Sequence, residues 1–252
     1  MSISDVRIIG LPGLPVITPG MDLAALMHHA MQRAGISLSA GDVLVVTQKI
    51  VSKAEGCLVN LNEVEPSPLA RRYAKLWDKD ARLVEVVFQQ SRRIVKMDRG
   101  VLITETHHGF ICANAGVDQS NIEGSDTVAV LPPDPDASAR AIREGLRQRL
   151  GVEVAVIISD TFGRPWRDGL VNVAIGLSGI LAVKDYTGQR DAQGYELRVS
   201  ALAIADELSA AAELVMNKLD NVPVAIIRGY DYPRGDGSLA QLIRQPERDL
   251  FR

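Results

Sequence analysis

Residues 154–164 of the chain have the sequence VAVIISDTFGR, an apolar run that ends in a serine, an aspartate and a threonine. A short run rich in β-branched residues and followed by polar ones predicts a buried strand over Val154–Ser159. Polar side chains that come directly after a buried strand commonly line ligand clefts. The stretch therefore predicts both a core strand and a ligand site at Asp160 and Thr161.

Further apolar runs predict the other elements of the fold. We expect strands over 6–9, within 42–48, over 171–181 and over 222–227, and a hairpin that pairs 101–106 with 110–113. We expect helices from Asp22 to about Gly35, over 66–78, from Asp136 or Ser138 to Leu150, and over 199–219. Residues 82–95 are predicted to be helical or mixed, and 49–54 to form a turn or short strand. Because strands and helices do not alternate regularly, the order predicts an α+β (mixed α/β) fold and not a TIM barrel.

The length and composition narrow the class of protein. The 252 residues fit a single domain over 1–252, and the proline-rich connector at 131–136 could divide it into two subdomains. A net charge of −3 lacks the basic excess that is typical of nucleic-acid and membrane-surface binders. Two cysteines cannot form a disulfide framework, and the sequence shows no targeting signal or membrane-length apolar run. We therefore expect a cytoplasmic protein.

Several common catalytic motifs are missing from the sequence. The chain has no G-x-x-x-x-G-K-[ST] loop, no G-x-G-x-x-G after a strand, no H-E-x-x-H and no G-x-S-x-G. Its four histidines form two adjacent pairs, His28-His29 and His107-His108. Adjacent side chains point away from each other on a helix or strand, so surface or interface histidines are expected rather than a metal site.

Two acidic positions could hold a divalent cation. Asp160, with the hydroxyl of Thr161 beside it, follows the strand predicted over 154–159. Asp118 lies in the segment NAGVDQSN at 114–121. A cation that also binds phosphates and water usually takes two carboxylate ligands from the protein. The residue types leave alternatives open, because Asp160 could simply cap or turn the chain and 114–121 has the composition of a loop whatever its role.

Three other stretches could bind anionic groups. Lys53, with Lys49 near it, follows an apolar strand and could neutralise a phosphate, although a solvated lysine is the commoner outcome. Arg164 and Arg167 flank Pro-Trp and could grip a carboxylate, or could lie on a surface loop in which arginine stacks on tryptophan. Residues 10–15, GLPGLP, could receive a ligand on backbone N–H groups or form a structural turn. A phosphate-handling site with a cation and no obvious nucleophile suits electrostatic phosphoryl transfer.

The order and spacing of several segments resemble one family. These segments are GLP at 10–12, DVLVV at 42–46 leading to SKAEG at 52–56, NAGVDQSN at 114–121, LPPDPD at 131–136, SDTFGR at 159–164 and PERDLFR at 246–252. Over roughly residues 8–252 the chain is similar to the coenzyme F420-0:L-glutamate ligase family, whose module also forms the N-terminal half of a fused actinobacterial protein. The segments at 114–121 and 159–164 are the most specific part of the resemblance.

The resemblance implies a GTP-dependent ligase that needs Mg²⁺ or Mn²⁺. GTP would phosphorylate the lactyl carboxylate of coenzyme F420-0, and the amine of L-glutamate would then displace phosphate to form an amide. The implied metal ligands are Asp118, Asp160 and Thr161. The implied nucleotide contacts are Leu11, Pro12, Gly13, Leu14, Thr47, Gln48, Lys53 and Asn121. The resemblance also implies an α+β fold of mixed sheets with flanking helices and an intertwined homodimer.

Some features go beyond the family pattern or depart from it. We expect Asp118, Asp160 and Arg164 to take part in catalysis, and we infer from chemistry alone that Arg164 and Arg167 hold the acidic substrates. Lys218 stands where some archaeal members carry an acidic metal ligand, which indicates either a single metal or a lysine that supplies the second charge. The chain ends where fused members continue into a nitroreductase-like domain, so we expect no such domain.

Three competing interpretations stay open. The same site would serve a ligase that glutamylates a different phosphate-bearing acid. A nucleotide-binding protein without catalysis is another class, although retention of both aspartates and Lys53 favours an enzyme. A metal-dependent phosphohydrolase would release phosphate without using glutamate. The sequence also leaves open the choice between GTP and ATP and the number of glutamates added.

Overall fold

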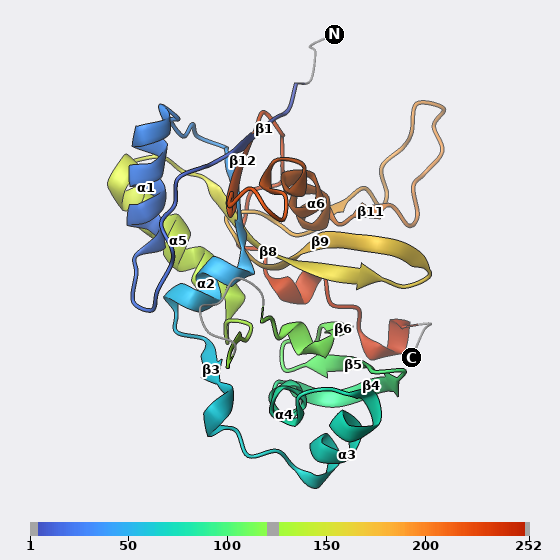
Figure 1. Ribbon diagram of the computed structural model, residues 1–252. Helices are drawn as coiled ribbons and strands as arrows, with labels where there is room; N and C mark the ends of the chain where they lie inside the picture. Colours follow the sequence, from blue (N-terminus) through green and yellow to red (C-terminus); the bar gives the residue numbers. More distant parts are fainter. Residues whose placement is uncertain (1–4, 120–125, 250–252) are drawn as a thin grey trace.

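The computed structural model describes residues 5–119 and 126–249. Its centre is a five-stranded mixed sheet with the strand order β1-β12-β2-β8-β9 (Figure 1). The strands are β1 (Arg7–Gly10), β12 (Val224–Arg228), β2 (Val43–Thr47), β8 (Ala155–Arg164) and β9 (Arg167–Ser178). Strands β2 and β8 are parallel, and the other neighbours in the sheet are antiparallel. This mixture confirms the predicted α+β class.

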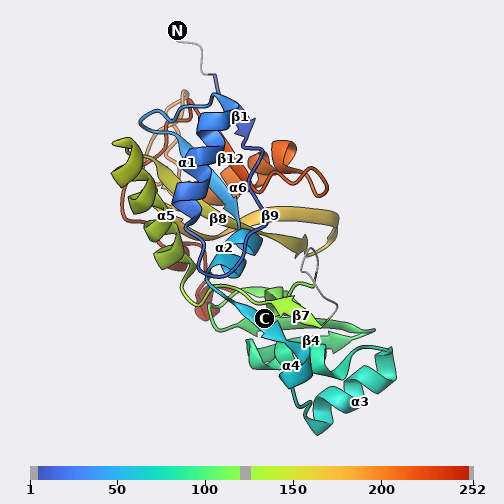
Figure 2. The ribbon, with the colours of Figure 1, turned by 60° about the vertical axis from the view of Figure 1, so that its left-hand side comes forward.

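Helices cover both faces of the central sheet (Figures 1 and 2). The helices are α1 (Leu23–Ala34), α2 (Gln48–Ala54) and α5 (Pro135–Leu150) on one face and α6 (Ile204–Met216) on the other. Along β2, Leu44 and Val46 pack with the first group, whereas Val43 and Val45 pack with α6. Successive side chains on a strand point to opposite faces, so one continuous apolar run contributes to two cores.

A small subdomain is inserted between α2 and α5, and it spans β3 to β7. Its elements are β3 (Leu58–Asn60), α3 (Pro68–Trp77), α4 (Ala81–Gln89), β4 (Ser91–Asp98), β5 (Val101–Thr106), β6 (Ile111–Ala113) and β7 (Thr127–Ala129). Strands β4, β5 and β6 form one antiparallel sheet, and β3 pairs with β7. The predicted pairing of 101–106 with 110–113 is confirmed by β5 and β6. The subdomain has cores of its own, and the larger one includes Tyr73 and Val87.

Helix α2 packs between the central sheet and the chain that leaves the small subdomain after β7. Ser52 is fully buried, and its hydroxyl donates to the carbonyl of Val130 at 2.7 Å. The amide of Gln48 in turn donates to the Ser52 hydroxyl at 2.6 Å. Buried polar groups are stable only when they are hydrogen-bonded, so these bonds fix α2 against the chain that follows β7.

Helix ends differ from the sequence prediction at two places. Helix α5 begins after Asp134, whose carboxylate accepts from the amide of Ala137, so the predicted start at Asp136 or Ser138 was too late. The helix predicted over 199–219 begins only at Ile204 and ends at Met216. The predicted ends at Gly35 and Gly151 are confirmed, because both glycines adopt the left-handed conformation that stops a helix.

Two segments differ in type or extent from their predictions, and a third confirms its prediction. Residues 49–54, predicted as a turn or short strand, belong to helix α2. Strand β8 continues past Ser159 to Arg164, because its pairing with β9 carries on beyond the core as a two-stranded hairpin. Residues 82–95, predicted to be helical or mixed, are mixed, because they divide into helix α4 and strand β4, with Arg92 and Arg93 on the strand.

The remaining regular structure is a short ribbon between β9 and α6, made of β10 (Lys184–Asp185) and β11 (Ala201–Leu202). Over 5–119 and 126–249, each helix is too short or too polar to cross a membrane.

Candidate active site

A cavity of about 880 Å³ opens where the parallel pairing of β2 with β8 ends. Thr47 and Ser159, which are the last register partners in this parallel pairing, both line it. Its other walls come from the loop after β1, helix α2, the segment around Asp118, strand β9 and the chain that follows α6. Ligands of open α/β sheets bind outside the carboxyl ends of the strands, so the position itself indicates a binding site.

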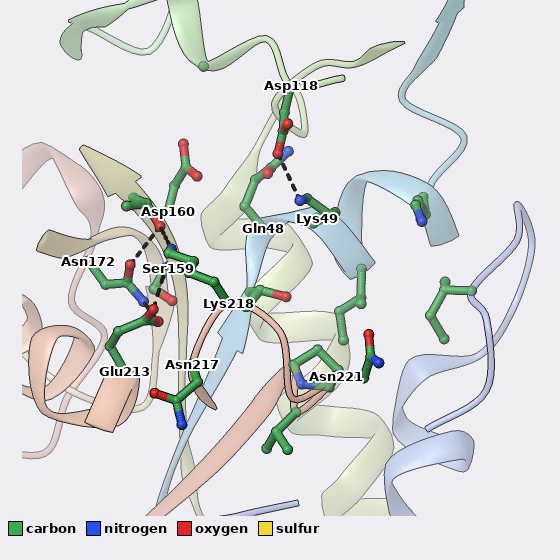
Figure 3. A pocket seen from close by; sticks show the side chains of 18 of the residues that line it. Gln48, Lys49, Asp118, Ser159, Asp160, Asn172, Glu213, Asn217, Lys218 and Asn221 are labelled. Carbon is green, nitrogen blue, oxygen red and sulfur yellow. Dashed lines mark hydrogen bonds and ion pairs between the residues drawn. The ribbon is translucent and has the colours of Figure 1, made fainter. Parts of the chain in front are cut away.

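Two carboxylates from different parts of the fold face this cavity (Figure 3). Asp160 lies on β8, and Asp118 comes from the small subdomain, where its backbone N–H and C=O pair with Ala129 at 3.0 and 2.8 Å. Burial raises the pKa of Asp160 to about 6, and the charge of Asp118 adds to this rise in pKa. The bond from the backbone N–H of Thr161 and the charges of Lys218 and Lys49 oppose it. The two aspartates therefore lie close enough to repel each other.

Two lysines of helix α2 line the same cavity. Lys49 and Lys53 are four residues apart, so the helix places them on one face. The ammonium of Lys49 lies 3.0 Å from a carboxylate oxygen of Asp118. Burial and the neighbouring Lys49 lower the pKa of Lys53, and Asp118 partly opposes this. The helix, which the sequence did not predict, is what brings both lysines to the site.

A closed ring of polar contacts lies beside Asp160. The ammonium of Lys218 donates to the hydroxyl of Thr161 at 2.7 Å, and that hydroxyl donates to the amide oxygen of Asn172 at 2.7 Å. The amide of Asn172 donates to Glu213 at 2.7 Å, and the other carboxylate oxygen of Glu213 lies 3.4 Å from Lys218. Figure 3 shows Asn172, Glu213 and Lys218 grouped next to Asp160. A lysine charge is thus built into the site at Thr161.

Sequence reasoning missed Asn172 and Glu213. Asn172 is a polar residue within an apolar strand, and its side chain is buried. Glu213 follows Ser209 by four residues on α6, beside the buried face of the helix. A polar side chain within or beside an apolar stretch was therefore the signal that could have marked each residue. The contact between Asn172 and Glu213, which are 41 residues apart, was not visible in the sequence.

The structure brings most of the predicted site residues together. Those that line the cavity are Leu14, Thr47, Gln48, Lys53, Asp118, Asp160 and Thr161. Leu11 is fully buried and donates its backbone N–H to Val224, while Pro12 and Gly13 lie next to it outside the cavity lining. Asn121 lies outside the described residues.

Arg164 and Arg167 lie elsewhere, at the tip of the β8–β9 hairpin. The guanidinium of Arg164 donates to the backbone carbonyls of Asp168 and Gly169, and Trp166 between the arginines is 79% exposed. Neither arginine is among the residues that line the cavity in the described chain. The exposed turn agrees with the surface position in the alternative interpretation, and the predicted contact of both arginines with substrate stays a prediction.

The donor set at the cavity fits a hard divalent cation. Asp118 and Asp160 provide two carboxylates that repel each other, and Thr161 adds a hydroxyl oxygen. Mg²⁺ and Mn²⁺ prefer oxygen ligands and commonly take only one or two carboxylates from the protein when phosphates supply the rest. Within the described ranges no group of three or more His, Cys, Asp and Glu side chains could hold a metal by itself. A cation here would therefore need phosphate or water ligands as well.

Comparison with known proteins gives one consistent result. The sequence model of the family described as F420-0:Gamma-glutamyl ligase matches residues 13–229. A protein of Methanothermobacter thermautotrophicus named coenzyme F420:L-glutamate ligase is 45% identical over 251 residues, which cover 98% of this chain and 99% of the relative. Proteins with the same name from Methanopyrus kandleri and Methanocaldococcus jannaschii are 45% and 42% identical, over 96% and 98% of this chain and 99% and 97% of the relatives.

Proposed function

This chain belongs to the F420-0:gamma-glutamyl ligase family, and we propose that it joins L-glutamate to coenzyme F420-0 through an amide bond. The observation that carries the proposal is the full-length similarity to relatives of that name, together with a cavity that combines paired carboxylates and lysines. Such a combination can bind a nucleotide and a cation next to an acidic substrate. The enzyme is thus an amide-forming ligase.

We propose further that GTP activates the acceptor. A carboxylate is a poor acylating group at neutral pH, so its oxygen first takes the γ-phosphoryl group of GTP and GDP leaves. The amine nitrogen of glutamate then attacks the carbonyl carbon of this acyl phosphate. The carbon–oxygen bond to phosphate breaks, inorganic phosphate leaves, and the amine proton passes to solvent. No covalent bond to the protein is needed.

The side chains around the cavity suit this sequence of steps. Lys53 and Lys49 are placed to offset negative charge on the phosphates, because both face the cavity from one side of α2. Asp118 and Asp160, with the oxygen of Thr161, would hold Mg²⁺ or Mn²⁺, which neutralises charge on a transferring phosphoryl group. Lys218 adds a cation that the ring with Asn172 and Glu213 holds in place.

We also propose that the enzyme is a homodimer. Several large apolar side chains are exposed on the sheet of the small subdomain and on the β8–β9 hairpin: Ile94, Val95, Val101, Ile111, Trp166 and Leu170. Exposed apolar side chains that gather on neighbouring elements are a mark of protein–protein interfaces, and strand β6 of that sheet contacts β8. Light scattering coupled to size-exclusion chromatography should give twice the 27.3 kDa chain mass, and a monomer mass would contradict this proposal.

The test of the ligase activity is a mass measurement. Purified protein is incubated with coenzyme F420-0, L-glutamate, Mn²⁺ and either GTP or ATP, and the deazaflavin product is weighed by mass spectrometry. We expect a gain of one or more glutamyl units with GTP, loss of the gain in Asp160→Ala, and retention in Asp231→Ala, which removes an exposed carboxylate away from the cavity.

Other outcomes would identify the alternatives. Cleavage of GTP without any gain in mass would indicate a different acceptor acid, or a phosphohydrolase if glutamate has no effect. A gain in mass with ATP and none with GTP would contradict the proposed nucleotide. Failure to bind or cleave any nucleotide would overturn the proposed activation step.

A further inference from the structure

Lys49 forms an ion pair that joins the two halves of the site. It lies in the first turn of α2, packed on the central sheet, whereas Asp118 belongs to the small subdomain. The ammonium and the carboxylate oxygen are 3.0 Å apart, and the two side chains are only 23% and 34% exposed. Figure 3 shows the pair at the edge of the cavity, across from Asp160. The contact is therefore partly shielded from water.

The charges around Lys49 are of both signs. The ammonium favours the ionised form of Asp160, and it disfavours the charged form of Lys53 one turn along the helix. Lys49 thus provides positive charge to the two carboxylates that the proposed cation would use. A divalent cation bound to the same carboxylates would repel the ammonium, because both are positively charged and both contact Asp118.

We propose that Lys49 makes cation binding depend on the nucleotide. The inference rests on the proposed function, since it assumes that Asp118 and Asp160 take Mg²⁺ or Mn²⁺ and that the cavity takes a nucleoside triphosphate. Without nucleotide, the ammonium of Lys49 competes with the cation for Asp118. With nucleotide, the phosphates beside Lys53 give the ammonium of Lys49 another anionic partner, and the competition ends.

The position of Lys49 on the helix supports this exchange. Lys49 and Lys53 share the face of α2 that lines the cavity, so a phosphate within reach of Lys53 is also close to Lys49. A lysine side chain is long and rotates freely about its four-carbon stem, and it can therefore change partner without a change in the backbone. Linkage requires that the effect is mutual, so the cation and the nucleotide each strengthen the binding of the other.

The test compares Mn²⁺ affinity in variants of the intact protein. The dissociation constant is measured from the electron paramagnetic resonance signal of free Mn²⁺, with no nucleotide and with one fixed concentration of guanylyl imidodiphosphate. The variants are Lys49→Gln and Lys49→Met, which remove the charge, and Lys49→Arg, which keeps it. Lys96→Gln is the matched control, because Lys96 also lies near an aspartate, at 3.9 Å, but on the exposed strand β4 outside the cavity.

We expect both neutral variants to bind Mn²⁺ about three- to tenfold more tightly than the wild type without nucleotide, which is the scale of one partly shielded ion pair. With the analogue, this advantage should shrink or reverse. Lys49→Arg and Lys96→Gln should behave as the wild type in both conditions. Mn²⁺ also binds the analogue in solution, but this contribution is the same for every variant at a fixed concentration.

Two results would overturn the inference. One is an unchanged or weaker Mn²⁺ affinity of Lys49→Gln and Lys49→Met without nucleotide. The other is a gain of the same size with and without the analogue, because that would show simple competition without coupling. A wild-type protein that binds no Mn²⁺ in either condition would overturn the inference and the proposed use of a metal together. If the wild type is an active ligase but the Lys49 variants have the Mn²⁺ affinity of the wild type, the inference alone is overturned.

Discussion

Replacing Asp160 by asparagine should make the metal-free protein more stable at neutral pH. Asp160 is ionised there at a cost, because burial and the neighbouring Asp118 raise its pKa from 3.8 to about 6. Each tenfold change in a protonation constant corresponds to about 1.4 kcal/mol, so a rise of this size corresponds to ~3 kcal/mol of lost stability. The value is an upper limit, since the side chain faces a cavity that water can enter.

The pH dependence follows from the direction of this shift in pKa. The native protein holds the proton of Asp160 more tightly than the unfolded chain does. The free energy of unfolding therefore falls as the pH rises from about 4 to about 6, and the loss is complete above that range. The amide in Asp160→Asn has no proton to lose, so the variant should gain on the wild type over the same interval and should have no advantage near pH 4.

The assay is urea denaturation in EDTA at several pH values between 4 and 8. Asp231→Asn, which changes an exposed carboxylate outside the cavity, should follow the wild type throughout. The reasoning would be refuted if Asp160→Asn were less stable than the wild type at pH 7.5, or if the difference between them did not vary with pH. Since Asp160→Asn should also abolish ligation, success would show that this carboxylate is kept for function at the expense of stability.

Two further predictions concern the frame of the central sheet. Arg228→Met should lower the free energy of unfolding by about 3–5 kcal/mol, because it leaves the buried carboxylate of Asp42 without two guanidinium hydrogen bonds of 2.9 and 2.6 Å. In the same urea assay, Arg149→Met, which removes a more exposed ion pair with Asp22, should lower it by ~1 kcal/mol or less. Gly176→Ala should lower the melting temperature sharply, because its new Cβ would lie 2.5 Å from the backbone at the start of α5. Gly163→Ala on β8, where nothing lies within 4 Å of the new Cβ, should change the melting temperature little. Equal melting temperatures of the two variants would contradict this packing argument.

The position of the site could be predicted from the sequence because it depends on local signals. The apolar run at 154–158 identifies a strand that is buried on both faces, and a polar pair at its end indicates where a ligand would bind. The sequence also grouped Asp118 and Lys53 with Asp160, and all three line one cavity. These residues carry their own signals of charge, hydroxyl oxygen or loop composition.

The parts that sequence reasoning missed depend on contacts between distant segments. Helix α2 has only seven residues and follows β2 without a loop, so it is too short to show a helical period. The extension of β8 to Arg164 is stabilised by pairing with β9 rather than by burial, so its polar residues resemble a loop. The ring around Thr161 forms only because β9 and α6 pack together on one face of the sheet.

The origin of the two carboxylates has a mechanical consequence. Asp160 belongs to the central sheet, and Asp118 is carried by a subdomain that the chain enters and leaves through the paired strands β3 and β7. Asp118 lies beside this pair of strands, because its backbone is bonded to Ala129 at the end of β7, whereas helices α3 and α4 lie at the far side of the subdomain (Figure 2). A substitution that shifts the pairing of β3 with β7 would therefore move Asp118 relative to Asp160. For the cation proposed above, this pairing would set the distance between the two carboxylate ligands, although none of its residues would touch the ion.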